Sequence, residues 1–117
     1  MIKYIKFPNF FKYAGITLFP FIFLNEKIKD KNNTVLINHE KIHLRQQIEL
    51  LIFFFYIIYL SNYLFNLIKY KNHNRAYRNI LFEREAYDNE IKLDYLENRK
   101  LFGWIRWILK KQLKKLN

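Results

Sequence analysis

The pattern of apolar and polar positions separates a short N-terminal part of the chain from a longer helical part. Both prolines, Pro8 and Pro20, lie within residues 1–20. Proline interrupts helices, so this is the part of the chain where a helix is least expected. Residues 16–24 are β-branched and aromatic, which favours a strand, and Pro20 marks an edge or a bulge in it. The polar residues 25–33 predict a turn or loop. We therefore expect short strands ahead of the helices.

From Thr34 onward the pattern predicts helices nearly to the end of the chain. Thr34 is a candidate N-cap for the first of them. That helix is expected to run into residues 50–60, eleven consecutive apolar positions. Because they are apolar on every side, they must be buried in protein or lipid. Ser61 and Asn62 interrupt this run, and we expect the chain to reverse there.

Two further helices are expected after a polar connection at residues 71–75, one over 76–99 and a last one over 101–116. The fold class is thus mainly α (α+β): a helical bundle with short N-terminal β-strands. At 117 residues the chain has the size of one domain. That domain, residues 1–117, comprises strands and a loop (1–33), the helices of the candidate site (34–99) and a basic amphipathic helix (101–116).

Composition and charge narrow the classes of function. The absence of cysteine excludes disulfides, thiolate metal ligands and cysteine nucleophiles. The formal net charge of +11 implies an acidic partner, either nucleic acid or anionic lipid. No nucleic-acid recognition motif accompanies this charge, so we expect no specific nucleic-acid partner. The first residues lack the pattern of a cleavable signal peptide, which favours the cytoplasm or the cytoplasmic face of a membrane.

The sequence HEKIH at residues 39–43 is the main candidate for chemistry. His39 and His43 are four residues apart, so on a helix both imidazoles project from one face. Two neutral imidazoles at this spacing can bind one zinc ion, and Glu40 is then placed to take a proton from a water that zinc activates. The chain has only three histidines, so chance rarely produces this pattern. The alternative is an exposed helix face with unrelated histidines.

A catalytic zinc site needs a third protein ligand, and a carboxylate from the second helix is the best candidate. His73 lies in the polar connection and is less suitable. On a helical wheel Glu83 falls at the edge of an apolar stripe that packs inward. Glu85 lies roughly opposite, with Asp88 and Asn89 nearby, and is expected to face solvent. We therefore choose Glu83 as the third ligand.

This arrangement resembles the gluzincin metallopeptidases, in which a glutamate from a second helix joins an HExxH helix. The segment Glu83-x-x-Ala86 is similar to the ExxA element of membrane-associated gluzincins that include the CAAX-prenyl-protease type. The chain length resembles that of minimal single-domain members. The resemblance implies that His39, His43 and Glu83 hold zinc. Glu40 would then be the general base, and the substrate would be a peptide or a protein.

The resemblance also implies roles for neighbouring groups. The family often has an aspartate where this chain has Tyr87, which would either donate to a developing oxyanion or pack as a core tyrosine. Gln46 continues the histidine face and would either orient a ligand or simply link two helices. In the family the strand before the zinc helix flanks the cleft. By that analogy, residues 16–24 would pair with an extended peptide through main-chain hydrogen bonds.

Association with a membrane is expected on two grounds. A simple span through residues 48–68 would place His43 and Glu83 on opposite faces of a bilayer, so a helical hairpin that dips into the membrane or lies on it is the better interpretation. The last helix has an apolar stripe, with Trp104 and Trp107 placed for headgroup depth. The lysines beside that stripe are Lys110, Lys111, Lys114 and Lys115. An anionic membrane surface is the expected partner.

The leading hypothesis is therefore a small, membrane-associated zinc metallopeptidase. The alternative from another class is a non-enzymatic, basic membrane-binding protein whose HExxH is incidental or degenerate. A third hypothesis is a nucleic-acid-binding module. Metal content separates the first hypothesis from the other two.

Overall fold

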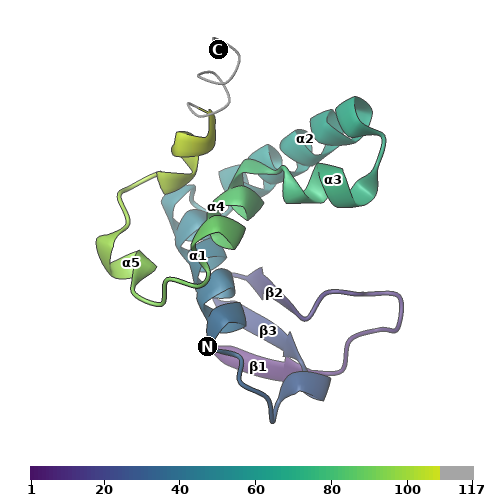
Figure 1. Cartoon of the computed structure of the whole chain (residues 1–117), viewed down its shortest axis with the longest axis vertical. Coiled ribbons are helices and arrows are strands. Elements are labelled where there is room, and N and C mark those ends of the chain that lie inside the picture. The colour runs from purple at the N-terminus through teal and green to yellow at the C-terminus, as the bar shows by residue number, and fades with distance from the viewer. Residues whose placement is uncertain (109–117) are drawn as a thin grey trace.

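The computed structural model describes residues 1–108 and confirms a mainly α fold with short N-terminal strands (Figure 1). The sheet lies at one end of the molecule, and the helices stack beside and above it. In chain order the elements are β1 (Ile2–Ile5), β2 (Gly15–Leu18), β3 (Phe21–Asn25), η1 (Glu26–Ile28), α1 (Thr34–Glu49), α2 (Phe53–Tyr70), α3 (His73–Arg78), α4 (Leu81–Asn89), α5 (Tyr95–Asn98) and η2 (Gly103–Ile105).

The sheet has the strand order β1-β3-β2, with β1 parallel and β2 antiparallel to β3. The prediction of one strand over residues 16–24 is wrong, because the chain turns at Phe19 and Pro20 to form a hairpin. Proline has no amide hydrogen to donate to a ladder, so a turn accommodates it better than the interior of a strand. The hairpin makes β2 an edge strand, and β2 packs against α1.

Helix α1, which carries both histidines of HEKIH, forms as expected. Thr34 is its first helical residue and Asn33 takes the N-cap position, so the N-cap prediction is wrong by one residue. The Asn32 side chain accepts a hydrogen bond from the Thr34 amide at 3.2 Å, which satisfies one of the free amides at this helix end. The buried side of α1 is mostly polar, which indicates a site rather than ordinary core. Its buried residues are Asn38, His39, Glu40, Ile42, His43, Gln46 and Gln47.

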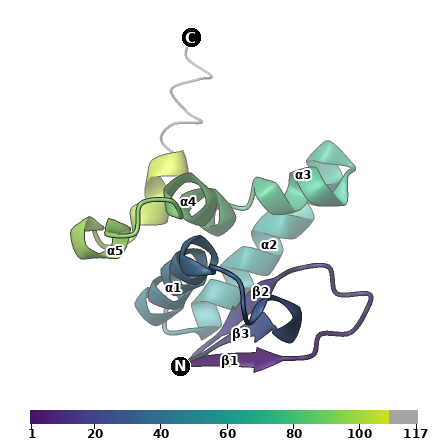
Figure 2. The same ribbon diagram turned by 60° about the horizontal axis from the view of Figure 1, so that its bottom comes forward.

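A sharp break separates α1 from α2, where the sequence predicts one continuous helix. Leu51 and Ile52 have φ values of 54° and 64°, and α1 and α2 meet with a bend of 114°. Ile52 forms a γ-turn in which the Phe53 amide donates to the Leu51 carbonyl. Figure 2 shows the two helices diverging from this break with the sheet below them. Since no glycine or proline marks the break, the apolar pattern of residues 50–60 conceals it.

Helix α2 extends further along the chain than predicted, which changes the helical hairpin that the sequence predicts at a membrane. Helix α2 continues through residues 61–62, and the chain reverses at Lys71, so the expected reversal point is wrong. Asn62 does not break the helix because its side chain accepts a hydrogen bond from the Leu81 amide at 2.8 Å and so joins α2 to α4. Within the described residues no single helix is long and apolar enough to cross a membrane, although α1 and α2 together have the length and composition of a bent span.

The helix expected over residues 76–99 is divided into α3, α4 and α5. Helix α3 begins inside the connection expected at residues 71–75, because the Asn72 side chain caps it by accepting from the Arg75 amide at 3.0 Å. Helix α4 begins after Ile80, whose backbone is extended. These short helices allow the chain to wrap around α1 and α2, which places α4 against the histidine helix.

Aromatic residues form the core between α2, α4 and η2. Phe82 stacks on Phe55 with ring centroids 4.6 Å apart, and Trp104 meets Phe82 edge-on at 5.1 Å. Trp104 and Trp107 are both buried, so the prediction that they lie at headgroup depth is wrong. Residues 101–102 form a turn, so the last helix does not begin at residue 101. The second half of that predicted helix, including its four lysines, lies outside the described residues.

Candidate metal centre

Two histidines of α1 and one glutamate of α4 bring three ligand atoms together. The Nε2 atoms of His39 and His43 are 3.1 Å apart, and Glu83 Oε1 lies 3.4 Å from the first and 3.0 Å from the second. Around a tetrahedral zinc ion with bonds of about 2.0–2.1 Å, neighbouring ligand atoms lie about 3.3 Å apart. All three side chains are buried. The group can hold a metal ion.

The outer ring nitrogen of each histidine is held by an oxygen acceptor. His39 Nδ1 lies 2.7 Å from Glu90 Oε2, so Nδ1 carries the proton that it donates to the carboxylate. His43 Nδ1 lies 2.8 Å from Gln46 Oε1. The Gln46 amide is fixed in this orientation because its Nε2 donates to the Phe82 carbonyl at 3.1 Å. His43 Nδ1 is therefore the donor as well, and both Nε2 lone pairs of the neutral rings point into the site.

Three electron-pair donors thus face one another, and without a cation they must share a proton. Burial by itself lowers the pKa of His43, but the adjacent Glu83 carboxylate raises this pKa to about 9. Burial would raise the pKa of Glu83, yet His43 and the hydrogen bonds from both histidines lower it well below its usual range. In the metal-free protein the site therefore contains a buried imidazolium–carboxylate pair. A metal ion competes with that proton for the same nitrogen.

Glu40 is buried directly beside the histidine pair, on the same helix. Its Oε2 accepts a hydrogen bond from the Thr17 hydroxyl of β2 at 3.0 Å. Burial raises the pKa of Glu40, and His43, His39 and Thr17 offset only part of that rise. A carboxylate with a raised pKa is a stronger base than an exposed one. Glu40 therefore combines a position at the site with the basicity that proton abstraction needs.

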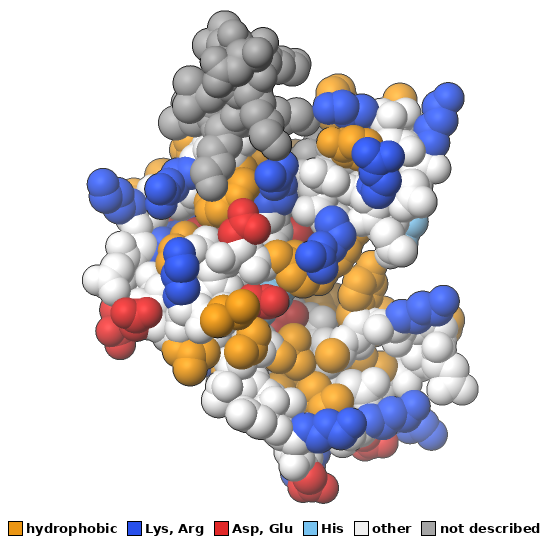
Figure 3. Space-filling model, in the orientation of Figure 1, with side chains coloured by type: hydrophobic (Ala, Val, Ile, Leu, Met, Phe, Trp, Pro, Cys, Tyr) orange, Lys and Arg blue, Asp and Glu red, His pale blue; other side chains and the backbone are white. Residues whose placement is uncertain are grey.

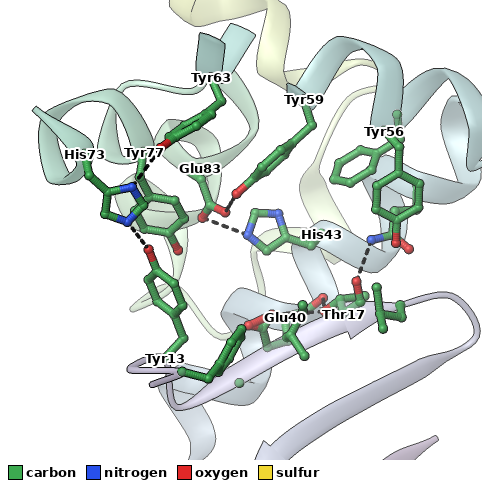
Figure 4. A pocket seen from close by; sticks show the side chains of 16 residues that line it. Tyr13, Thr17, Glu40, His43, Tyr56, Tyr59, Tyr63, His73, Tyr77 and Glu83 are labelled. Atoms are coloured by element: carbon green, nitrogen blue, oxygen red, sulfur yellow. Dashed lines mark hydrogen bonds and ion pairs between the residues drawn. The ribbon is translucent and has the colours of Figure 1, made fainter. Parts of the chain in front are cut away.

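A cavity of about 450 Å³ opens beside the ligand atoms, lined by Glu40, His43 and Glu83 (Figure 4). Strand β2 forms one wall and α2 the opposite wall. The tyrosines that line it are Tyr13, Tyr56, Tyr59, Tyr63 and Tyr77. A smaller cavity of about 140 Å³ lies on the side of His39 and shares Glu40 with the first. Figure 3 shows apolar side chains around the hollow between the helices and the sheet.

Tyr59 fixes the orientation of the Glu83 carboxylate. Its hydroxyl donates to Glu83 Oε2 at 2.7 Å, while Glu83 Oε1 faces the histidines. Burial, followed by the charge of Glu83, raises the pKa of Tyr59 far above its usual value, so this hydroxyl remains a donor at every physiological pH. The carboxylate therefore offers one oxygen to the site and keeps the other occupied.

His73 does not join the ligand group, in agreement with the choice of a carboxylate as third ligand. It lies on the wall of the larger cavity, where its Nε2 is 2.9 Å from the Tyr13 hydroxyl and its Nδ1 is 2.9 Å from the Tyr63 hydroxyl. These bonds link the loop before β2 to α2 and α3 across the cavity (Figure 4).

The prediction that Glu85 faces solvent is wrong, because this carboxylate is fully buried. It accepts hydrogen bonds from Gln46, Tyr95 and Arg99, and Arg99 also pairs with Glu49 at 2.7 Å. The wheel assigns one inward side to α4, whereas the chain after α4 folds back and covers its other side. Both sides of α4 are therefore packed, one by the metal group and one by the Arg99 cluster.

The two residues expected beside Glu85 on the solvent side behave differently. Asp88 is exposed, as expected, and accepts a hydrogen bond from the Trp107 indole. Asn89 is buried, and its side chain donates to the Glu85 carbonyl at 2.8 Å, so its predicted exposure is wrong.

Tyr87 and Gln46 both lie next to the histidines. Tyr87 packs edge-on against His39 with ring centroids 4.5 Å apart, and its hydroxyl is 3.1 Å from that of Tyr77. Tyr87 is therefore a partly buried tyrosine that packs on His39, and its role toward an oxyanion stays a prediction. The sequence leaves two roles open for Gln46, orienting a histidine or linking two helices. In the structure it does both, because its side chain contacts His43 and also links α1 to α4.

Three residues that position the site are absent from the set that the sequence predicts: Glu90, Thr17 and Tyr59. Glu90 carries a signal in the sequence, because it follows Glu83 by seven residues, or two helical turns, and so lies on the same face. Thr17 and Tyr59 carry none, since each reaches the site only through the packing of β2 and α2 against α1.

Comparison with known proteins finds no matching family model, no similar curated protein and no similar solved structure. The resemblance to the gluzincins therefore stays a prediction that depends on the residues of the site alone.

Proposed function

We propose that this protein is a small zinc-dependent metallopeptidase with Glu40 as its general base. The observation that carries the proposal is the convergence of two imidazole lone pairs and one carboxylate oxygen beside a second buried carboxylate. Structural zinc sites are usually closed by four protein ligands, whereas catalytic sites keep three ligands and an open position. A three-ligand group that borders a cavity suits the catalytic type.

Zinc is the metal that fits this donor set best. Two imidazoles and one carboxylate form a set typical of catalytic zinc. The oxygen acceptors on both Nδ1 atoms, Glu90 and Gln46, orient the rings and increase their basicity, as is usual for histidines that bind metal. A bound zinc ion would supply Lewis-acid chemistry, acidifying a water and polarising a carbonyl group.

The chain's own residues supply the remaining steps of a hydrolysis. Glu40 would accept a proton from the attacking water and return it to the leaving amine. The Thr17 hydroxyl holds the Glu40 carboxylate toward the strand side of the cavity. Tyr59 keeps Glu83 in its ligand orientation. Because Glu40, His43 and Glu83 are buried, their charges interact more strongly than they would at an exposed surface.

Two features support a peptide as substrate. Strand β2 is an edge strand of the sheet, and its first residue, Gly15, lies beside Glu40. An added Cβ atom at Gly15 would be 3.4 Å from Glu40 Oε1. An extended peptide laid along this edge would bring its backbone near the base. The larger cavity next to the ligands has the size and aromatic lining to accept a bulky apolar side chain.

Metal analysis of the purified protein, followed by a hydrolysis assay, tests the proposal. One zinc ion per chain should survive dialysis, and His39→Ala or His43→Ala should lose it. Glu40→Gln should keep the metal but abolish cleavage in a mixed peptide library read by mass spectrometry, because the substitution removes only the base. Glu97→Gln, on an exposed site, is the matched control and should change neither.

Two results would refute the proposal in different ways. A protein that is folded and free of metal at neutral pH, even after incubation with zinc, would favour the non-enzymatic alternative. A zinc-loaded protein whose cleavage of peptides is the same with Glu40 and with Gln at that position would assign the metal a structural role.

A further inference from the structure

The outward side of α2 is an apolar stripe that no other described element covers. Its exposed members are Phe53, Phe54, Ile57, Leu60, Leu64, Phe65 and Ile68. On a helical wheel they fall within an arc of about 140°, and the stripe is about 22 Å long. Ser61 is the polar residue within that arc.

This stripe is not part of the protein's core. The opposite side of α2 makes the internal contacts: Phe55 stacks on Phe82, and Asn66 donates to the Ala76 carbonyl at 3.1 Å. A surface helix ordinarily presents polar residues to water and apolar residues to the core. Here the side that faces solvent is apolar, and exposed patches of this kind mark a surface that binds another molecule or a membrane.

The charges around the stripe identify what it binds. Residues 50–82 contain no aspartate or glutamate. Lys69, Lys71 and Arg75 are exposed at the C-terminal end of α2, and Lys69 and Arg75 lie over the Tyr70 ring at 5.2 Å and 4.7 Å from its centroid. The stripe thus ends in a cluster of cations that contains no acidic partner.

From this combination we infer that α2 docks on an anionic lipid bilayer. The apolar stripe inserts at the boundary between headgroups and acyl chains, and Lys69, Lys71 and Arg75 contact lipid phosphates. A second copy of the chain would cover the apolar side equally well, but it offers no acidic residues from the same region to its partner's cations. An anionic bilayer supplies both an apolar layer and negative charge. The docking does not depend on the proposed peptidase activity.

Flotation of the full-length protein with vesicles tests the inference. Protein should float with phosphatidylcholine vesicles that contain phosphatidylglycerol, and it should bind vesicles of phosphatidylcholine alone at least tenfold more weakly. The double variant Leu60→Gln/Ile68→Gln should lower the partition coefficient for anionic vesicles by about tenfold or more. Lys69→Gln/Lys71→Gln should lower it as well, and added salt should then matter less.

Matched control variants show whether a loss of flotation is specific to the α2 stripe or follows from any loss of exposed apolar or charged side chains. Leu60 and Ile68 are 58% and 77% exposed, and Leu93 and Ile91, which lie elsewhere, are 59% and 78% exposed. Ile91→Gln/Leu93→Gln and Lys29→Gln/Lys31→Gln should float like the unmodified chain. Thermal unfolding of each variant shows whether it is folded.

Two outcomes would overturn the inference. The first is equal loss of flotation in the stripe variant and its matched control. The second is a chain that ignores anionic vesicles but forms a dimer in solution, with the dimer lost in Leu60→Gln/Ile68→Gln; a second copy would then cover the stripe.

Discussion

His39 donates its Nδ1 proton to Glu90, 2.7 Å away, and Glu90 follows directly after the helix that supplies the third ligand. Glu83 and Glu90 are seven residues apart, so one side of α4 and its C-cap provides both a candidate ligand and the carboxylate that orients His39, another candidate ligand. The family resembled by the sequence often places an aspartate at the position of Tyr87 for such a purpose. Here the carboxylate comes from one helical turn further along the chain.

This contact predicts that Glu90→Ala weakens metal binding without removing a ligand. The affinity for zinc should fall by about 10- to 100-fold, because His39 loses the acceptor that fixes its tautomer and ring orientation. Competition with a chromophoric zinc chelator measures the change. The exposed Glu97→Ala is the control, and an unchanged affinity in Glu90→Ala would show that the contact does not orient His39.

Glu83 and Glu85 are two residues apart, yet their substitution should have opposite consequences. Glu83→Gln should reduce zinc affinity by about a hundredfold or more, because a neutral amide replaces an anionic ligand. Glu85→Gln should leave zinc affinity nearly unchanged but lower the free energy of unfolding by roughly 3 kcal/mol, since the buried Arg99 loses one of its two carboxylate partners.

Zinc titration and urea unfolding, each performed on both variants, measure this contrast. Loss of zinc affinity in Glu85→Gln alone would show that α4 is rotated relative to the structure. Equal losses in both variants would show that the metal group and the Arg99 cluster form one unit.

The His43–Glu83 pair predicts how the stability of the metal-free protein depends on pH. The folded-state pKa of His43 is about 9, above its ordinary value of 6.5, so the pair stabilises the fold fully below about pH 6.5. That contribution, roughly 3 kcal/mol, should be lost as the pH rises from 6.5 through 9. Urea unfolding of chelator-treated protein across this range measures the loss, and His43→Asn should show little of it.

Metal binding should have the opposite pH dependence in the same window. Zinc must displace the proton of His43, so zinc affinity should rise by up to about tenfold for each pH unit until the pKa is reached. An affinity that is flat between pH 6.5 and 9 would contradict the buried ion pair.

The Thr17 hydroxyl predicts a shift in the acid limb of activity. Its hydrogen bond lowers the pKa of Glu40 against the effect of burial, so Thr17→Val should raise that pKa and move the acid limb of kcat/KM to higher pH. Thr34→Val, at an exposed helix start, is the control. A lower rate at every pH with an unshifted limb would assign Thr17 a purely structural role.

The sequence predicts the position of a side chain correctly where the local helical pattern alone determines it. The spacing of His39 and His43 requires a shared helix face, and the wheel directed Glu83 toward that face. The structure brings these three side chains together. The same wheel failed for Glu85, because a helical wheel describes one helix and cannot show that a later segment covers its other side.

The helix boundaries failed for a related reason. Leu51 and Ile52 adopt positive φ values that their residue types disfavour, so residue type gives no sign of the break between α1 and α2. Conversely, Ser61 and Asn62 have the composition of an interruption but lie within α2, and Asn62 bonds to the Leu81 amide. The contact of Asn62 is a tertiary one, and a single sequence does not contain it.

The ligands of the candidate centre come from α1 and α4, which are separated along the chain by the whole of α2 and α3. An ion bound there would close a large loop in a chain that has no cysteine with which to form a disulfide. Because such an ion binds the folded chain and not the unfolded one, the folded fraction would follow the supply of free zinc. Starvation for the metal would then expose the chain to proteolysis, so zinc availability would set its lifetime in the cell as well as its activity.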